Sequence, residues 1–417
     1  GSSHNGSKRW RGPALAHPRS SWPAALDTAM QPFATTASAE HSSRYVRHRS
    51  TTWSLGVLAA FCLTTSVQAS RITVSNKYLI ASFPDLQQVN YIRVPDPTWR
   101  PLIMAGLLRP KAIAVDANNM RLFLIDEMAM HVVWYSLMLL DSGLLMTDGR
   151  PHMVTSTIIA RDIAVDDLGA VFVAGRYDPG PPTVPIEAVF KFSASQTSQS
   201  TLPNFIPIPT TAWDSQDASG GGPATAQLIA ANTVVVDSLN VYWGNSNRVS
   251  ADGASVVRAA LHAAPDKPED FVWVLANNVD KVDTLVLTAS DVYYAANGKV
   301  YGVPKRKTNE MCTGSGGTCP EVVKKKDNDP TALKVSAMVW DGEGTVFVAD
   351  SGAGSIYRFS CGSLNMHLLE QVTASPGIFG MSLFVPISAA ARLAGRATHV
   401  VLLGAVVALI GLGRALT

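Results

Sequence analysis

The chain has 417 residues, of which 47% are hydrophobic and 16% are charged, and its formal net charge is +2. This composition is that of a globular protein and excludes a disordered, coiled-coil or collagen-like chain. A net charge this small gives no case for a nucleic-acid partner, and four cysteines are too few for a disulfide-rich scaffold.

Residues 1–69 are predicted to precede the folded domain. Three arginines between positions 44 and 49 are followed by an apolar run, 53–63, and by the small residue Ala69. A basic region, a short apolar region and a small residue are typical of a secretory signal peptide, here with cleavage after Ala69. A signal anchor and a buried helix are the alternatives.

A two-strand pattern recurs along the middle of the chain. An apolar strand, often ending in aspartate, precedes a turn and a second strand with an aromatic residue, and a third strand and usually a fourth follow. The copies are spaced by 45 to 70 residues, and the longest spacing holds an insertion, 193–231. Four short strands per repeat predict an all-β, six-bladed β-propeller. The aromatic residues of the second strands are Tyr78, Phe123, Phe172, Tyr242, Tyr293 and Phe347.

The first repeat lacks its inner strand, and the segment 375–384 after the last repeat is expected to supply it. In this segment Pro376 matches Pro110, which stands before the inner strand of the second repeat. Closure of the ring removes exposed strand edges. A competing interpretation assigns the same apolar stretch to a membrane signal. With closure, the propeller spans residues 70–385.

Some of these repeats resemble known propeller families. The stretches 240–245 and 291–297 resemble the Tyr-Trp-Thr-Asp propellers of the LDL-receptor class B type, and 349–358 is similar to an NHL repeat. The resemblance implies a propeller that serves as an extracellular binding platform, a scaffold or, in some members, a hydrolase. Gly244 and Asn245 stand where the motif has Thr and Asp, so receptor ligand contacts do not carry over.

An aspartate ends the inner strand in four repeats: Asp116, Asp166, Asp237 and Asp341. Aspartate side chains accept hydrogen bonds from nearby backbone N–H groups in tight turns. We therefore expect these four residues to stabilise turns and not to form a site.

The residues at the start of the inner strands are expected to line an axial channel. Asp162, Asn232 and Asp283 are the oxygen donors among them, with Lys111 and Arg161 nearby. Ca²⁺ takes six to eight oxygen ligands, so a calcium-dependent lactonase or arylesterase is an alternative function. The mixed charges favour a solvated channel mouth with ion pairs. Since the chain has no nucleophile-elbow, zinc-protease or phosphate-loop motif, we expect no catalysis and no cofactor.

A loop with two cysteines is the most unusual surface feature of the sequence. Cys312 and Cys319 bracket a Gly- and Thr-rich stretch and are expected to form a disulfide in an oxidising compartment. Cys361 is then either free and buried or paired with another chain.

Two basic triplets flank this loop, and they are Lys305, Arg306 and Lys307, and Lys324, Lys325 and Lys326. Between residues 70 and 388 the chain has 24 basic and 30 acidic residues. A basic cluster on an otherwise acidic domain attracts polyanions such as sulfated glycans. A solubilising insertion on the outer rim is the alternative interpretation.

Residues 386–417 resemble a signal for attachment of a glycosylphosphatidylinositol (GPI) anchor. Small residues at 388–390, a spacer and a terminal apolar run, 400–413, follow one another, with attachment expected at Ser388. A membrane-spanning helix needs about 20 apolar residues. A short membrane anchor and an ordinary C-terminal helix are the alternatives.

The sequence therefore favours a secreted, GPI-anchored propeller that binds an extracellular protein or an anionic glycan at the cell surface. A calcium-dependent hydrolase and a structural spacer are the alternative functions.

Overall fold

The computed structural model describes residues 76–386, except 179, 182–184, 196, 198–205, 208–230, 246–253, 262–271, 280, 307–318 and 326–331. The described residues lie in the second of two compact units, Ile72–Thr417, and the first unit is Gly1–Arg71. The expected signal peptide, the GPI signal and Ser388 lie outside the described residues. The division into 1–69, 70–385 and 386–417 therefore stays a prediction.

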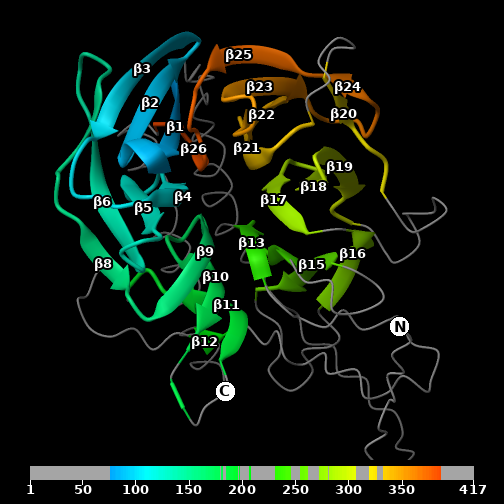
Figure 1. The fold of residues 1–417 in the computed structure, drawn as a ribbon, viewed down its shortest axis with the longest axis horizontal. Coiled ribbons are helices and arrows are strands. Elements are labelled where there is room, and N and C mark those ends of the chain that lie inside the picture. Colours follow the sequence, from blue (N-terminus) through cyan, green and yellow to red (C-terminus); the bar gives the residue numbers. More distant parts are fainter. Residues whose placement is uncertain are drawn as a thin grey trace, which may run out of the picture. The chain divides into compact units, whose positions relative to one another are not determined.

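Six antiparallel sheets surround a central axis, as Figure 1 shows, and each sheet is one blade. Blade 1 contains β26 (Met381–Phe384), β1 (Lys77–Phe83), β2 (Gln88–Val94) and β3 (Asp96–Ile103). Blade 2 contains β4 (Pro110–Asp116), β5 (Arg121–Asp126), β6 (His131–Leu139), β7 (Leu145–Thr147) and β8 (His152–Thr155). Blade 3 contains β9 (Ile158–Val165), β10 (Val171–Tyr177), β11 (Ile186–Phe192) and β12 (Ile206–Pro207).

The other three blades follow the same order from the axis outward. Blade 4 contains β13 (Ala231–Val236), β14 (Asn240–Asn245), β15 (Ala254–Ala260) and β16 (Val272–Val279). Blade 5 contains β17 (Val282–Leu287), β18 (Asp291–Ala296) and β19 (Lys299–Pro304). Blade 6 contains β21 (Val335–Trp340), β22 (Thr345–Asp350), β23 (Ser355–Ser360) and β25 (Glu370–Ala374). A parallel pair, β20 (Val323–Lys324) and β24 (His367–Leu368), lies outside these sheets.

The C-terminal strand closes the ring, as the sequence predicts. Strand β26 pairs antiparallel with β1, so that Phe384 lies opposite Tyr78 and Met381 lies opposite Ala81. The inner strand of blade 1 thus comes from the end of the domain and its other strands come from the beginning. In the closed ring, every inner strand has a neighbouring inner strand on each side.

The core consists of apolar layers between neighbouring blades. One cluster joins blades 1 and 2 through Tyr78, Tyr91 and Leu145, and another joins blades 2 and 3 through Phe123 and Phe190. Burial of one large apolar side chain contributes about 1.5–3 kcal/mol. The predicted aromatic residues of the second strands are all buried: Tyr78, Phe123, Phe172, Tyr242, Tyr293 and Phe347.

The repeated aspartates stabilise turns, which confirms the prediction from the sequence. One oxygen of Asp166 accepts hydrogen bonds from the N–H groups of Leu168 and Ala170, at 3.0 and 2.8 Å. In blade 6, Asp341 accepts from the N–H groups of Gly344 and Thr345, both at 3.0 Å. Asp116 and Asp237 make the same kind of bond in their own turns.

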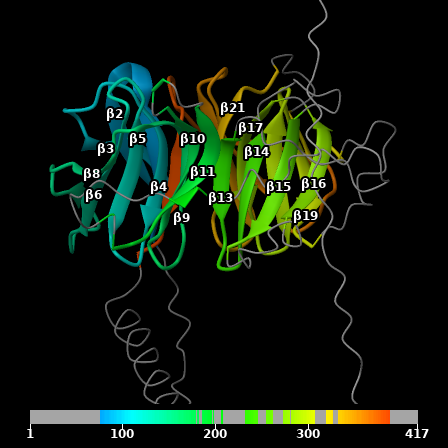
Figure 2. The same ribbon diagram turned by 90° about the horizontal axis from the view of Figure 1, so that it is seen from below.

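The connections between antiparallel strands alternate between the two faces of the ring, which Figure 2 shows from the side. We call the face with the connections β1–β2, β3–β4, β5–β6 and β25–β26 the entrance face. The connection β1–β2 contains the short 3-10 helix η1 (Pro84–Leu86). The opposite face is called the exit face, because the described chain begins and ends there, at Asn76 and Pro386.

In the part of the chain that the structure describes, no helix has the length and apolar character needed to cross a membrane.

Candidate functional site: the axial channel and its mouth

The inner strands β4, β9, β13, β17, β21 and β26 surround a cavity of about 980 Å³ on the axis of the ring. This volume is at the upper end of the range for small-molecule pockets. The residues predicted to lead into the channel do line it, and they are Lys111, Arg161, Asp162, Asn232 and Asp283. Ser336 lines the cavity at the corresponding position of blade 6.

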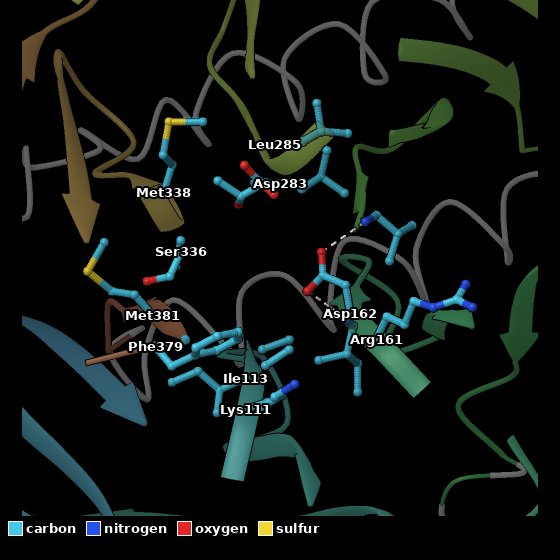
Figure 3. Close-up of a pocket in the computed structure, with 18 of the residues that line it drawn as sticks. Lys111, Ile113, Arg161, Asp162, Asp283, Leu285, Ser336, Met338, Phe379 and Met381 are labelled. Atoms are coloured by element: carbon cyan, nitrogen blue, oxygen red, sulfur yellow. Dashed lines mark hydrogen bonds between the residues drawn. The ribbon is translucent and has the colours of Figure 1, made fainter. Parts of the chain in front are cut away.

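The channel changes from polar to apolar with depth. Each inner strand runs from the entrance face to the exit face, and the pairing register of β4, β9, β13, β17 and β21 shifts at the polar positions. Apolar residues two positions further along these strands also line the cavity, and they are Ile113, Ile163, Val234, Leu285 and Met338. Figure 3 shows Asp162, Asp283 and Ser336 around the same cavity as Ile113, Leu285 and Met338.

On one side of the mouth, two basic side chains share one carboxylate. Lys111 Nζ forms an ion pair with Glu127, and Arg109 Nη1 lies 3.2 Å from the other oxygen of Glu127. Lys111 Nζ also lies 5.3 Å from the centre of the Phe379 ring, which is within the range of a cation–π contact. This group combines a net positive charge with an aromatic surface.

Arg161 joins blade 3 to blade 4. Its guanidinium group donates hydrogen bonds to both oxygens of Glu187, at 2.5 and 2.9 Å, and another to the backbone oxygen of Ala231 at 3.1 Å. A bidentate pair of this kind fixes the orientation of the planar guanidinium. Arg161 is therefore held in the wall of the channel.

Asp162 forms a second link between the same blades. Its Oδ2 accepts hydrogen bonds from the Thr233 hydroxyl at 2.6 Å and from the Val234 N–H at 2.9 Å, and its Oδ1 accepts from the Ile163 N–H at 2.9 Å. Burial raises the pKa of Asp162 to about 6, although these hydrogen bonds offset part of the effect. Both carboxylate oxygens are thus used inside the protein.

Asn232 and Asp283 have their own internal partners. The amide nitrogen of Asn232 donates to the backbone oxygen of Val282 at 2.7 Å, and Asp283 lies 3.3 Å from the Lys281 ammonium group. Among the described residues, no group of three or more His, Cys, Asp or Glu is placed to hold a metal ion. The three predicted donors line one channel, and Asp162 and Asn232 also make hydrogen bonds within the fold, so Ca²⁺ binding at these residues stays a prediction.

The basic triplets lie differently from the sequence prediction. Residues 321–325 run beside β19, where the Val322 N–H donates to the Val300 oxygen at 2.9 Å, so they form an outer edge of blade 5. Lys325 is buried and lies 3.0 Å from the buried Asp350 carboxylate. Lys305 lies 3.2 Å from Asp237.

The other basic residues of this region are exposed or outside the described residues. Arg306 and Lys324 are exposed, whereas Lys307 and Lys326 are not described. The two triplets therefore do not present six basic side chains on one loop, because Lys305 and Lys325 are held in ion pairs within the fold.

The described cysteines are in different states. Cys361 is a free thiol, partly buried, and burial raises its pKa. Cys319 is buried and is not a free thiol. Cys312 lies outside the described residues, so the pairing of Cys312 with Cys319 stays a prediction.

Exposed apolar side chains that were not predicted lie on the entrance face of blades 1 to 3, on one side of the channel mouth. Met130 and Ile159 line the channel itself. We call the whole set the entrance patch, and it consists of Leu86, Met104, Leu108, Met128, Met130 and Ile159, which are 49–66% exposed. A signal existed in the sequence, because methionine and leucine occupy connections where polar residues are usual.

Comparison with known proteins supports the fold. The sequence matches no protein-family profile and no curated protein. A chain in the crystal structure of a nidogen/laminin complex is 11% identical, with a TM-score of 0.50, covering 75% of this chain and 100% of that chain. A gluconolactonase from Xanthomonas campestris is 12% identical, with a TM-score of 0.41, covering 72% of this chain and 86% of that chain.

The calcium-binding protein regucalcin from Agrobacterium tumefaciens str. C58 is also 12% identical, with a TM-score of 0.38, covering 63% of this chain and 75% of that chain. Likeness at such low identity concerns the fold alone. The chain is a six-bladed β-propeller, and its fold is similar to that of the chain in the nidogen/laminin complex.

Proposed function

We propose that this chain is a secreted propeller, held at the cell surface by a GPI anchor at Ser388, that binds an extracellular protein through its entrance face. The observation that carries the binding proposal is the entrance patch beside the channel mouth. Contiguous exposed apolar surface is uncommon on soluble proteins and is typical of interaction sites. Methionine side chains are flexible and polarisable, which suits contact with a protein surface.

The polar groups beside the patch support a protein partner. Arg109, Lys111 and Glu127 form an ion-paired group next to Met128 and Met130. An apolar centre with charged groups at its rim is the usual anatomy of a protein–protein interface. The apolar side chains would supply burial, and the ion pairs would fix the orientation of the partner.

An anionic glycan is less well supported as the ligand. Lys305 and Lys325 are paired with Asp237 and Asp350, so they do not extend toward an external polyanion. Among the described residues, no group of three or more His, Cys, Asp or Glu supports the hydrolase alternative. The chain of similar fold in the nidogen/laminin complex is a precedent for a propeller in a complex with another protein.

The first experiment tests whether the protein is held at the cell surface by a GPI anchor. The chain is expressed in a eukaryotic cell, and intact cells are treated with phosphatidylinositol-specific phospholipase C. We expect the protein to appear in the medium without the 400–417 peptide. Retention in the cell pellet with that peptide present would contradict the anchor.

The second experiment tests binding with the released protein. Saturable binding to cells is measured for the wild type, for Met128→Asp/Met130→Asp, and for the control Met366→Asp/Leu368→Asp, at exposed apolar residues outside the entrance patch. We expect the entrance-face variant to lose about tenfold in affinity, because central apolar contacts contribute most of the binding energy. The control should bind like the wild type.

Pretreatment of the cells separates the alternatives. Protease treatment should abolish binding, whereas heparinase treatment and added heparin should not change it. Loss of binding only with heparinase would indicate a glycan, and the absence of saturable binding would indicate a structural spacer.

A further inference from the structure

A β-hairpin projects from blade 2 on the exit face. It is formed by the end of β6 and by β7, with Met138 opposite Met146. One side of the hairpin faces the core through Leu137 and Leu145, which are 3% and 2% exposed. The other side and the turn expose four apolar residues, Met138, Leu140, Leu144 and Met146, which are 37–46% exposed.

The turn of this hairpin is held in place by blade 1. The Tyr78 hydroxyl donates a hydrogen bond to the Gly143 oxygen at 2.9 Å, and the Leu145 N–H donates to the Tyr91 hydroxyl at 3.0 Å. Within the turn, the Leu140 N–H donates to the Leu144 oxygen at 2.9 Å. The exposed leucines are therefore presented by a fixed backbone.

Two further leucines project from the same face. Leu168 and Leu239 occupy equivalent turns after the inner strands of blades 3 and 4, and they are 74% and 69% exposed. The N–H group of each donates to the aspartate at the start of its turn, Asp166 or Asp237, at 3.0 Å. The turn aspartate is bonded to the backbone, and the leucine side chain points to the solvent.

We call Leu140, Leu144, Leu168 and Leu239 the exit patch. It extends over blades 2, 3 and 4.

The described chain ends on this same face, close to the hairpin. The Phe384 and Tyr78 rings are 5.9 Å apart between centroids, and Tyr78 in turn is bonded to Gly143 in the hairpin turn. The last described residue, Pro386, is two residues before Ser388. Two extended residues span at most about 7 Å. A lipid anchor at Ser388 would therefore be attached close to the exit face.

We infer that the exit patch contacts the phospholipid of the outer leaflet, so that the entrance face points away from the membrane. This inference rests on the lipid anchor of the proposed function. Exposed aliphatic side chains gain free energy when they enter the interfacial region of a bilayer. Asp141 in the hairpin turn and Asp167 beside Leu168 are exposed, Arg93 lies against Gly143, and Lys305 is ion-paired with Asp237 beside Leu239. The patch thus combines aliphatic side chains with charges of both signs, which fits zwitterionic phosphatidylcholine.

With the exit face toward the membrane, the two apolar patches have different roles. The entrance patch lies beside the mouth of a channel with polar lining residues, which suits specific recognition. The exit patch consists of four leucines on turns, which suits contact with a fluid and structureless surface.

Cysteine accessibility on intact cells tests this orientation. Leu144→Cys and Leu168→Cys are compared with Leu86→Cys on the entrance face, each in a Cys361→Ser background. The cells are treated with a bulky, membrane-impermeant maleimide before and after release by phospholipase. We expect both exit-face variants to label at least about fivefold more slowly while the protein is anchored. After release all three variants should label at similar rates.

The outcomes separate this inference from the proposed anchor. A protein that phospholipase does not release contradicts the anchor and, with it, this inference. A protein that is released but labels equally before and after release contradicts the orientation alone.

A reconstituted system then identifies what covers the patch. The purified anchored protein is inserted into phosphatidylcholine vesicles that contain no other protein. Continued protection of Leu144→Cys and Leu168→Cys shows that lipid is sufficient to cover the patch. Loss of protection in the vesicles shows that another protein covered the patch on cells, and overturns the lipid assignment.

Discussion

The Tyr78 hydroxyl group donates a hydrogen bond to the backbone oxygen of Gly143, at 2.9 Å, across the boundary between blades 1 and 2. Tyr78 lies on β1, which also pairs with the closing strand β26. One buried side chain thus connects the closure of the ring to the hairpin that carries Leu140 and Leu144.

We expect Tyr78→Phe to lower the free energy of unfolding by about 0.5–1.5 kcal/mol, because the half-buried Gly143 oxygen loses its donor while the aromatic packing remains. Urea unfolding measures this loss. Hydrogen exchange at residues 140–145 should increase as well. Tyr91→Phe removes the neighbouring acceptor for the Leu145 N–H and should raise exchange in the same turn. Unchanged exchange in both variants would contradict the anchoring role of these hydroxyl groups.

The Asp162 carboxyl predicts a specific pH dependence. Its pKa in the folded protein is about 6, because burial raises it above the ordinary value of 3.8. The folded state therefore binds this proton more tightly than the unfolded state does. The stabilisation from this group is fully present below pH 4 and is lost as the pH rises through 6.

Asp162→Asn removes this titration and keeps an oxygen that can accept from Thr233 and Val234. Between pH 5 and pH 8, we expect the stability of the variant relative to wild type to increase by roughly 1–2 kcal/mol. Denaturant unfolding at the two pH values measures this difference. If the difference in stability between the variant and the wild type does not change with pH, Asp162 titrates like an exposed carboxyl group.

The ion pair between Lys325 and Asp350 is buried, with 7% and 0% side-chain exposure. Burial alone would raise the pKa of Asp350, but Lys325 and backbone N–H groups hold it below its usual value. We expect Lys325→Met to destabilise the protein by about 3–5 kcal/mol, because it leaves a buried carboxylate without its cation.

Lys324→Met, at the exposed neighbouring position, is the matched control and should change stability by less than about 1 kcal/mol. The double variant Lys325→Met/Asp350→Asn should recover part of the loss, since the unpaired charge is gone. Similar effects of Lys325→Met and Lys324→Met in thermal unfolding would argue against a structural role for this pair.

Gly380 directly precedes the closing strand β26, and its backbone lies close to Lys111 in blade 2. A Cβ atom at this position would stand 2.1 Å from the Lys111 backbone oxygen. Because the clash is with the backbone, a change of side-chain rotamer cannot remove it. The Gly380 N–H also donates to the Ser82 hydroxyl at 2.8 Å. We expect Gly380→Ala to cost about 1–3 kcal/mol or more in stability.

Gly344→Ala is the control for this substitution, because a Cβ atom there meets nothing within 4 Å. Chemical denaturation should show little change for the control. Equal stability of the two variants would mean that the closing segment shifts easily, which is inconsistent with a tightly closed ring.

The repeated pattern in the sequence was sufficient to predict the propeller. Aromatic residues recur in the second strands because each blade must fill the same space against its neighbour. Aspartates recur in the turns because each turn needs the same hydrogen-bond acceptor. The position of Pro376 relative to Pro110 predicted closure, since the ring lacked one inner strand. All of these signals arise from local geometry repeated along the chain.

The site could be predicted only in part. The sequence placed Lys111, Arg161, Asp162, Asn232 and Asp283 at the channel, because their position follows from the repeat. It could not show that Asp162 and Asn232 are bonded to neighbouring blades, because those partners are 50 to 72 residues away in the chain. The use of Asp162, Asn232 and Asp283 as calcium ligands stays a prediction.

The basic triplets show the same limit. Lys324, Lys325 and Lys326 are alike in sequence, yet Lys325 is buried beside Asp350 because residues 321–325 form an edge of blade 5. The sequence by itself determined the strands, their turns and the number of blades, since these depend on periodicity and on neighbouring residues. Only the tertiary structure decided which charges are paired and which leucines and methionines share a face, because contacts across blades join residues that no local pattern relates.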